Sequence, residues 1–366
     1  MSEILRRHAF SLTFLVILFG YLFFSAGDDI QRFAGFTMGT TYNVQVVGLP
    51  DEPPAAEVAG DIERLLNHLD REVFSTYAPD SELSRFNRHG VAVPFAASQE
   101  MIEVLSLAGE ISVLTGGAFD VTVGPLVNLW GFGPEPGPAE DTVPDDGEIA
   151  SALQRVGYEY LSIDAAASEI SKGRELYVDL SAVAKGYAVD RLAAYLDELG
   201  VSSYFLDVGG ELKMRGLKPD GSSWIPAIET PDVAQSRIYE VFFSRGDTMA
   251  VAGSGDYRNY FELDGVRYSH EIDPRTGRPV RHNLAAAYVI DDSAARADAL
   301  ATAFMVMGLE ESRQLASAQG QAVYLIYKPR GEGADFEPNF EPNFEHDFEY
   351  SFEHYVSNQF SQYLND

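Results

Sequence analysis

Residues 178–187 read Val-Asp-Leu-Ser-Ala-Val-Ala-Lys-Gly-Tyr, and this stretch passes from a strand-like run into a helix that we expect over 181–200. Gly200 is the kind of residue that commonly closes a helix. Helix N-termini attract anions through unpaired backbone N–H groups, and Lys185 adds a positive charge there. The Walker A pattern GxxxxGK[ST] does not occur in the sequence. The corner therefore predicts an anion site that is not a P-loop.

Around this corner, apolar residues repeat with helical spacing in some segments and with strand spacing in others. We expect helices over 58–74, 101–114 and 293–307, and strands in the second half of 36–47 and over 204–208, 224–229 and 322–327. Strands and helices do not alternate strictly, as they would in a dinucleotide-binding fold. The sequence therefore predicts an α+β fold in which helices and strands are mixed.

Composition excludes several classes of function. The 366 residues include 26 Lys and Arg against 56 Asp and Glu, a net charge of −30. Phosphate backbones repel a chain this acidic, so we expect no nucleic-acid partner. Cysteine is absent, which excludes disulfides, cysteine-ligated metals and a catalytic thiol. Any metal must be bound by oxygen or imidazole.

The two ends of the chain differ from its middle. Residues 9–24 are almost wholly apolar and follow Arg6 and Arg7, which indicates that 1–27 is a signal peptide or membrane anchor. The rest of the chain would then lie at the periplasmic side of the cell inner membrane, anchored or exported. Residues 331–366 are acidic, and Phe-Glu recurs there at 336, 340, 344, 348 and 352. We interpret them as a low-complexity insertion and the C-terminal end, which either is simply exposed or docks a partner.

Three short clusters are candidates for binding a planar or polar ligand. Met38 lies in the small-residue corner 37–40, Tyr77 follows several hydroxyl residues, and Asp120 follows a glycine turn. Small residues let a ligand approach the backbone closely, and an aromatic ring with hydroxyl neighbours can stack on a ring and bond to its edge. Each cluster also has a plain structural interpretation: a β-turn, a helix exit with serine caps, and a capped turn. The residues alone leave both interpretations open.

Two further clusters carry groups suited to proton transfer and to metal binding. His270 lies before a turn and is the best candidate acid or base, although it could instead brace the turn. Asp298 and Thr302 are four residues apart on a predicted helix and therefore share one face. A carboxylate with a hydroxyl is an oxygen pair that suits Mg²⁺. An alanine-rich helix that carries both by chance is the alternative.

Taken together and in this order, the clusters resemble the FAD:protein FMN transferase family, also called the ApbE family. The matching stretches read FTMGTTYNV, FSTYAPDSELSRFN, TGGAFDVTVGPLVNLWGFGP, YVDLSAVAKGYAVD, FLDVGGELKMRG, GDYRNYFELDGVRYSHEIDPRTGRPV and ADALATAFMVMG. These seven stretches lie between about residues 33 and 327. Seven matches in the same order are far more specific than any single match. The resemblance implies an ApbE-type, T-fold-related architecture, with the catalytic domain over 28–330.

The resemblance also implies a reaction and its participants. Members of the family use Mg²⁺ to transfer the FMN moiety of FAD to a Thr or Ser hydroxyl of a target flavoprotein, and AMP leaves. The implied partner is a flavoprotein subunit that carries the acceptor residue, for example in a membrane redox complex. A protein that only holds FAD and a Mg²⁺-dependent FAD pyrophosphatase would use the same residues and remain alternatives. A periplasmic interaction module that uses the acidic tail is a further alternative.

Site residues carry over by motif position. The resemblance implies FAD contacts at Met38, Thr76, Tyr77, Ala78, Asp120, Lys185, His270 and Glu271. It implies magnesium ligands at the Ala182 carbonyl, the Asp298 carboxylate and the Thr302 hydroxyl. A general base must take the acceptor proton, and the candidates are His270 and Asp273.

Overall fold

The computed structural model describes residues 30–134, 142–231, 237–256, 260–263, 266–329 and 352–365. The expected signal or anchor segment, 1–27, lies outside these residues, as do most of the Phe-Glu repeats. Within these ranges, no helix is long and apolar enough to cross a membrane.

Helices and strands are mixed along the chain, as the sequence predicts. The helical segments are α2 (Ala55–Asn67), η1 (His68–Phe74), α3 (Glu82–Asn87), α4 (Gln99–Leu114), α5 (Gly124–Leu129), α6 (Asp146–Leu153), η2 (Tyr158–Tyr160), α7 (Ala184–Glu198), α8 (Ala294–Gln319) and α9 (Asn358–Ser361). The strands of the main sheet are β1 (Ile30–Thr37), β2 (Thr40–Val47), β6 (Ser203–Val208), β7 (Glu211–Arg215), β10 (Met249–Gly255), β15 (Leu284–Asp291), β16 (Ala322–Tyr327) and β17 (Glu353–Val356). The short strands are β3 (Phe95–Ala96), β4 (Leu161–Asp164), β5 (Glu169–Lys172), β8 (Ala227–Glu229), β9 (Ile238–Val241), β11 (Tyr260–Leu263), β12 (Val266–Ser269), β13 (Ile272–Asp273) and β14 (Arg278–Pro279).

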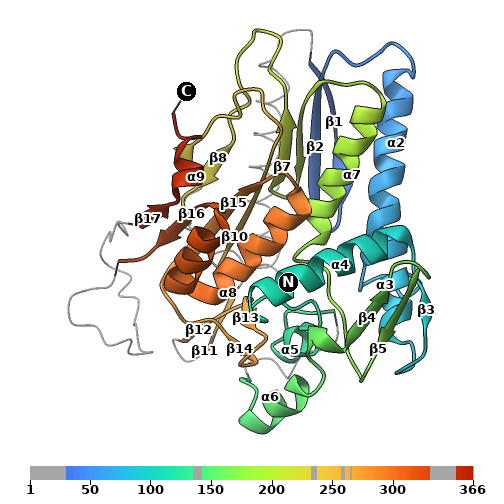
Figure 1. Cartoon of the computed structure of the whole chain (residues 1–366), viewed down its shortest axis with the longest axis vertical. Helices are drawn as coiled ribbons and strands as arrows, with labels where there is room; N and C mark the ends of the chain where they lie inside the picture. The colour runs from blue at the N-terminus through green and yellow to red at the C-terminus, as the bar shows by residue number, and fades with distance from the viewer. Residues whose placement is uncertain are drawn as a thin grey trace, which may run out of the picture.

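An eight-stranded antiparallel sheet organises the molecule, in the order β1-β2-β6-β7-β10-β15-β16-β17. Its strands show the period of two expected for a sheet with two different faces. In β2, for example, Tyr42, Val44 and Val46 are buried in the main core. Helices α7 and α8 pack on that face and on each other, as Figure 1 shows. A second cluster on the opposite face includes Trp224 and Phe242.

The elements nearest the predicted site begin and end close to where the sequence places them. The helix expected over 181–200 begins at Ala184 and ends at Glu198. The one expected over 293–307 begins at Ala294 but continues to Gln319, through a non-helical residue, Gly308. The expected helix over 58–74 becomes α2 followed by the π-helical turn η1.

Two other segments refine the sequence interpretation. The corner at 37–40 is a two-residue hairpin turn between β1 and β2, in which Met38 and Gly39 both have positive φ. This is the backbone sign expected of a type I′ turn. The region beyond 330, expected to lie apart from the catalytic domain, returns to the main sheet. There β17 pairs with β16, and Phe360 is fully buried.

Candidate active site

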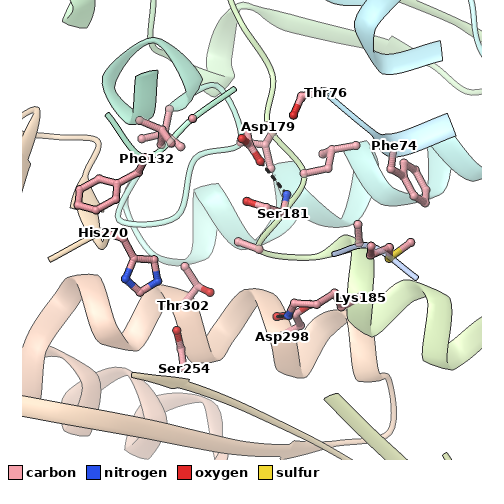
Figure 2. A pocket seen from close by; sticks show the side chains of 18 of the residues that line it. Phe74, Thr76, Phe132, Asp179, Ser181, Lys185, Ser254, His270, Asp298 and Thr302 are labelled. Atoms are coloured by element: carbon pink, nitrogen blue, oxygen red, sulfur yellow. Dashed lines mark hydrogen bonds and ion pairs between the residues drawn. The ribbon is translucent and has the colours of Figure 1, made fainter. Parts of the chain in front are cut away.

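A cavity of about 710 Å³ lies where the β1–β2 turn, η1, the start of α7, the first half of α8 and the loop after β12 meet. Its size falls within the range of small-molecule and cofactor sites. Figure 2 shows many of the side chains that line it. The predicted site residues that line it are Met38, Thr76, Tyr77, Asp120, Ala182, Lys185, His270, Glu271, Asp298 and Thr302. Ala78 and Asp273 are not among the lining residues.

Lys185 lies in the first turn of α7, between two buried carboxylates. Its Nζ donates a hydrogen bond to Glu211 Oε1 and lies 3.7 Å from Asp298 Oδ1. Burial lowers the pKa of Lys185, but the two carboxylates raise it by more, so the amine stays charged. Burial raises the pKa of Glu211 and of Asp298 despite the lysine. Two buried carboxylates therefore share one ammonium in this part of the cavity.

The oxygen groups on α8 and before α7 fit a hard divalent cation. Asp298 and Thr302 lie one turn apart on α8 and both line the cavity, as does Ala182 just before α7. The Gly186 N–H donates to Asp298 Oδ2 at 3.0 Å, which fixes the carboxylate. Among the described residues, no group of three or more His, Cys, Asp and Glu residues is arranged to hold a metal. The set of one carboxylate (Asp298) and neutral oxygens (Thr302 and Ala182) suits Mg²⁺, which commonly binds one or two carboxylates and keeps water ligands.

His270 lies across the cavity from the α7 corner. Its ring points toward the turn of α8 that carries Thr302 (Figure 2). The His270 Nε2 atom is 3.7 Å from Oε1 of Glu271, and that oxygen accepts a 2.8 Å hydrogen bond from Ser254 Oγ. The Phe132 ring packs edge-on at 6.3 Å between ring centroids. The geometry places an imidazole that is one-third exposed beside a buried carboxylate, which suits proton transfer.

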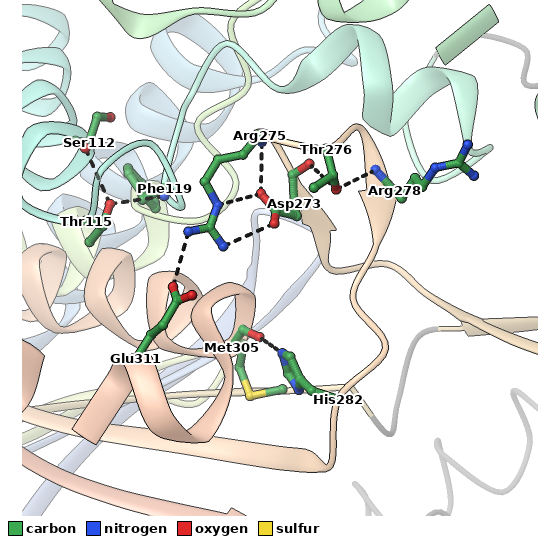
Figure 3. Close-up of polar contacts among 10 residues, drawn as sticks. All are labelled: Ser112, Thr115, Phe119, Asp273, Arg275, Thr276, Arg278, His282, Met305 and Glu311. Atoms are coloured by element: carbon green, nitrogen blue, oxygen red, sulfur yellow. Dashed lines mark hydrogen bonds and ion pairs between the residues drawn. The ribbon is translucent and has the colours of Figure 1, made fainter. Parts of the chain in front are cut away.

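Asp273, the other candidate base, is committed to an ion pair. Its carboxylate accepts hydrogen bonds from Arg275 Nε at 3.0 Å and Nη2 at 3.1 Å. The same guanidinium reaches Glu311 at 3.2 Å, and so ties the turn to α8 (Figure 3). The Arg275 guanidinium thus binds both carboxylate oxygens of Asp273, and Asp273 does not line the cavity. The position of Asp273 fits a role in holding the turn rather than in proton transfer.

Asp120 lines the cavity while its oxygens brace the loop. Oδ1 accepts hydrogen bonds from the N–H and hydroxyl of Thr122, and Oδ2 accepts one from the Tyr158 N–H. Burial raises the pKa of Asp120 in spite of these bonds. The preceding turn is held by Thr115 Oγ1, which accepts the Phe119 N–H (Figure 3). Asp120 therefore caps the turn and also forms part of the cavity wall.

The β1–β2 turn and the segment after η1 form one rim of the cavity. The Met38 N–H donates to Asp70 Oδ2 at 3.0 Å, which ties the turn to η1. Ser75 Oγ accepts the N–H groups of Tyr77 and Ala78. These bonds leave the Tyr77 side chain 71% exposed at the rim. Such a ring is available to stack on a ligand.

Several residues that line the cavity carry no distinctive signal in the sequence. Asp179, whose Oδ1 accepts the Ser181 N–H at 2.8 Å, lies within the quoted stretch 178–187 but has no distinctive spacing. Glu211 and Ser254 come from β7 and β10, so only the sheet order brings them to the cavity. The one signal for Glu211 is an acidic residue directly after a Gly-Gly pair in a strand-like run.

Sequence comparisons agree on one family. The ApbE family model matches residues 38–326. The chain is 47% identical over 296 residues to an FAD:protein FMN transferase of Vibrio cholerae serotype O1, which covers 81% of this chain and 86% of that protein. It is 37% identical over 341 residues to the FAD:protein FMN transferase of Escherichia coli K12, covering 89% of this chain and 95% of that protein.

Solved structures show the same likeness. The flavin transferase ApbE from Vibrio cholerae aligns with a TM-score of 0.79 at 41% identity, covering 92% of this chain and 99% of that one. The apo form of the Pseudomonas stutzeri flavinyl transferase ApbE aligns with a TM-score of 0.78 at 38% identity, covering 93% and 99%.

Proposed function

The chain belongs to the ApbE family and is an FAD:protein FMN transferase, and we propose that it performs this transfer with Mg²⁺, onto a Thr or Ser hydroxyl, with AMP as the leaving group. The observation that carries the proposal is the meeting, in one cavity, of three groups from separate parts of the chain. These are the cation Lys185, the oxygen pair Asp298 and Thr302, and the imidazole of His270.

The metal would be held by the Asp298 carboxylate, the Thr302 hydroxyl and the Ala182 carbonyl. When bound there, Mg²⁺ supplies Lewis-acid stabilisation of the charge on the pyrophosphate of FAD. Two carboxylates and one ammonium meet at this place, and a bound cation would favour the ionised form of both carboxylates. All three donors are oxygens, the kind of ligand that Mg²⁺ prefers.

The protein's own groups position the phosphates and stabilise their charge. Lys185 offers a fixed ammonium, and the N-terminus of the 15-residue helix α7 offers a positive dipole end. Phosphoryl transfer depends mainly on such positioning and charge stabilisation. The acceptor oxygen forms a phosphoester bond with the FMN phosphorus of FAD. The bond from that phosphorus to the bridging oxygen breaks, and AMP leaves with the bridging oxygen.

His270 is proposed as the base that takes the proton of the acceptor hydroxyl. The neighbouring Glu271 carboxylate would stabilise the imidazolium that forms. Glu271 is itself fixed by Ser254, so the pair is pre-arranged. Asp273 is not proposed for this step, because Arg275 holds both of its oxygens.

We propose that FAD contacts Met38, Thr76, Tyr77, Asp120, Lys185, His270 and Glu271, which line one cavity. Ala78 would contribute through the backbone of the same rim, where Ser75 fixes its N–H.

The partner and the location follow from the reaction and from the N-terminal sequence. We propose that a flavoprotein subunit, for example of a membrane redox complex, supplies the acceptor residue. Residues 1–27 would anchor the enzyme or direct its export to the periplasmic side of the inner membrane. Fractionation of cells that express the full chain tests this: the enzyme should be found with the membrane or in the periplasm, and a cytoplasmic enzyme would contradict it.

The reaction is tested with purified enzyme, FAD, Mg²⁺ and a flavoprotein domain that carries an acceptor Thr. We expect a fluorescent flavin that stays with the domain after denaturing electrophoresis, and a peptide map that places it on the hydroxyl residue. Chelation of Mg²⁺ should abolish the label. Free FMN and AMP without label would instead indicate a pyrophosphatase, and FAD that remains bound and intact would indicate a flavin-holding protein.

A further inference from the structure

Lys185 is held from one side by a residue that has no assigned role in the transfer. Glu211 is the first residue of β7, it is only 3% exposed, and its Oε1 accepts the hydrogen bond from Lys185 Nζ. Its other oxygen, Oε2, is buried and accepts no hydrogen bond from any described residue. Because Glu211 also lines the cavity, its carboxylate competes for the lysine at the place where the substrate phosphates are proposed to bind.

The backbone before Glu211 is shaped to let the lysine stem reach it. Gly209 has a φ of 64°, and a Cβ there would lie 3.3 Å from Lys185 Cδ and 2.6 Å from Thr40 Cγ2. A side chain at this position would therefore press on the stem. The glycine turn and the acid after it together guide Lys185 toward β7.

The opposite carboxylate, Asp298, is close enough to compete for the same ammonium. Its Oδ2 is occupied by the Gly186 N–H, whereas Oδ1 faces Lys185 Nζ at 3.7 Å, beyond hydrogen-bonding distance. Lysine is a point charge on a flexible four-carbon stem, so a small rotation would close this gap. A lysine bonded to Oδ1 would occupy the proposed magnesium ligand.

We propose that Glu211 is a positioning residue that draws Lys185 away from Asp298 and so keeps Asp298 Oδ1 available to Mg²⁺. The inference rests on the magnesium site proposed above. The Lys185 ammonium lies between two carboxylates, but it does not interact with them equally. It donates a hydrogen bond to Glu211 and lies 3.7 Å from the nearer oxygen of Asp298. Neutralising Glu211 removes the stronger attraction, and Lys185 then moves onto Asp298 and competes with the metal.

The test measures cation binding directly, with Mn²⁺ as the probe and electron paramagnetic resonance as the readout, without FAD. Glu211→Gln keeps the size of the side chain and removes its charge. We expect at least a tenfold weaker Mn²⁺ affinity in this variant. Glu82→Gln is the matched control, because Glu82 is a buried carboxylate of α3 that does not line the cavity. Its Mn²⁺ affinity should equal that of the wild type.

A double variant separates positioning from simple charge. Any anion near the metal attracts it, so Glu211→Gln could weaken binding without any movement of Lys185. With Lys185→Met as the background there is no lysine to compete, and we expect Glu211→Gln to change the affinity less than twofold. Equal losses in both backgrounds, or no loss in the single variant, would overturn the proposal.

The remaining outcomes are also decisive. If Glu211→Gln does not fold, Glu211→Asp takes its place, because it keeps the charge but shortens the reach to Lys185. We then expect a weaker affinity that is again absent in the Lys185→Met background, and an unchanged affinity would contradict the role. If neither the wild type nor Asp298→Asn binds Mn²⁺, the proposed magnesium site is wrong, and this inference is wrong with it.

Discussion

Replacing Gly186 by Ala tests the close packing of α7 against α8, on which the site is built. An added Cβ would lie 2.3 Å from the Ala294 carbonyl oxygen and 2.7 Å from the Ala295 Cα. Ordinary contacts begin at 3.4 Å, so the shortfall at the oxygen is 3.4 − 2.3 = 1.1 Å. Both obstacles are backbone atoms, which cannot swing aside as side chains do. The two helices must therefore separate by roughly 1 Å, because packed interiors hold no spare space.

The energetic cost follows from this shift. Overpacking a close-packed contact costs about 1 to 3 kcal/mol, and backbone obstacles favour the upper end. The higher helix propensity of alanine offsets at most about 1 kcal/mol of this cost, because alanine stabilises a helix by that much relative to glycine. We therefore expect Gly186→Ala to lower the free energy of unfolding by about 2 kcal/mol. The same shift displaces Asp298 from the Gly186 N–H and from Lys185. A misplacement of about 1 Å can cost on the order of 100-fold in rate, so we expect a loss of that size.

Urea unfolding and the rate of acceptor labelling measure the two effects. Gly109→Ala in α4 is the matched control, because a Cβ there meets no atom within 4 Å. This variant should gain about 0.5 to 1 kcal/mol of stability, with an unchanged rate. A Gly186→Ala variant that unfolds at the wild-type urea concentration and labels at the wild-type rate would refute the described packing.

Three further substitutions probe the site and its surroundings. Asp298→Ala should abolish Mg²⁺-dependent labelling without changing the circular dichroism spectrum, since it removes a metal ligand rather than core volume; full activity at low Mg²⁺ would exclude the ligand role. His270→Ala should slow the chemical step by about 10²- to 10⁴-fold with little change in FAD affinity, and an unchanged single-turnover rate would exclude it as the base. Burial raises the pKa of Asp207 from 3.8 to about 6, so the folded state binds the extra proton and the free energy of unfolding should fall as pH rises through that window. The fall should be up to roughly 3 kcal/mol, at about 1.4 kcal/mol per pKa unit, and Asp207→Asn should remove it; an unchanged slope in urea unfolding against pH would contradict the assignment.

Local sequence patterns predicted the elements that carry the site. The spacing of Asp298 and Thr302 placed both on one helix face, and the structure confirms that both line the cavity. The stretch around Lys185 was predicted to be a helix N-terminus, and α7 begins at Ala184. These predictions succeed because helical periodicity and end signals act over a few residues.

Long-range contacts could not be predicted in the same way. Glu211 meets Lys185 because β7 lies beside β10 in the sheet and α7 packs on that sheet, an arrangement that no short pattern records. Asp273 is a second candidate base in the sequence, but its carboxylate is bound by Arg275, two residues further along the chain. The return of β17 to the sheet is equally invisible, because the strand follows an acidic repeat.

The most direct test of the transferase reaction is the intact mass of the acceptor domain, measured together with the AMP released in the same reaction. With enzyme, FAD and Mg²⁺, we expect each domain to gain the mass of one FMN phosphoester and one AMP to appear for each domain labelled. Both changes should vanish with Asp298→Ala. AMP that appears with free FMN while the mass of the domain stays constant would contradict transfer to protein.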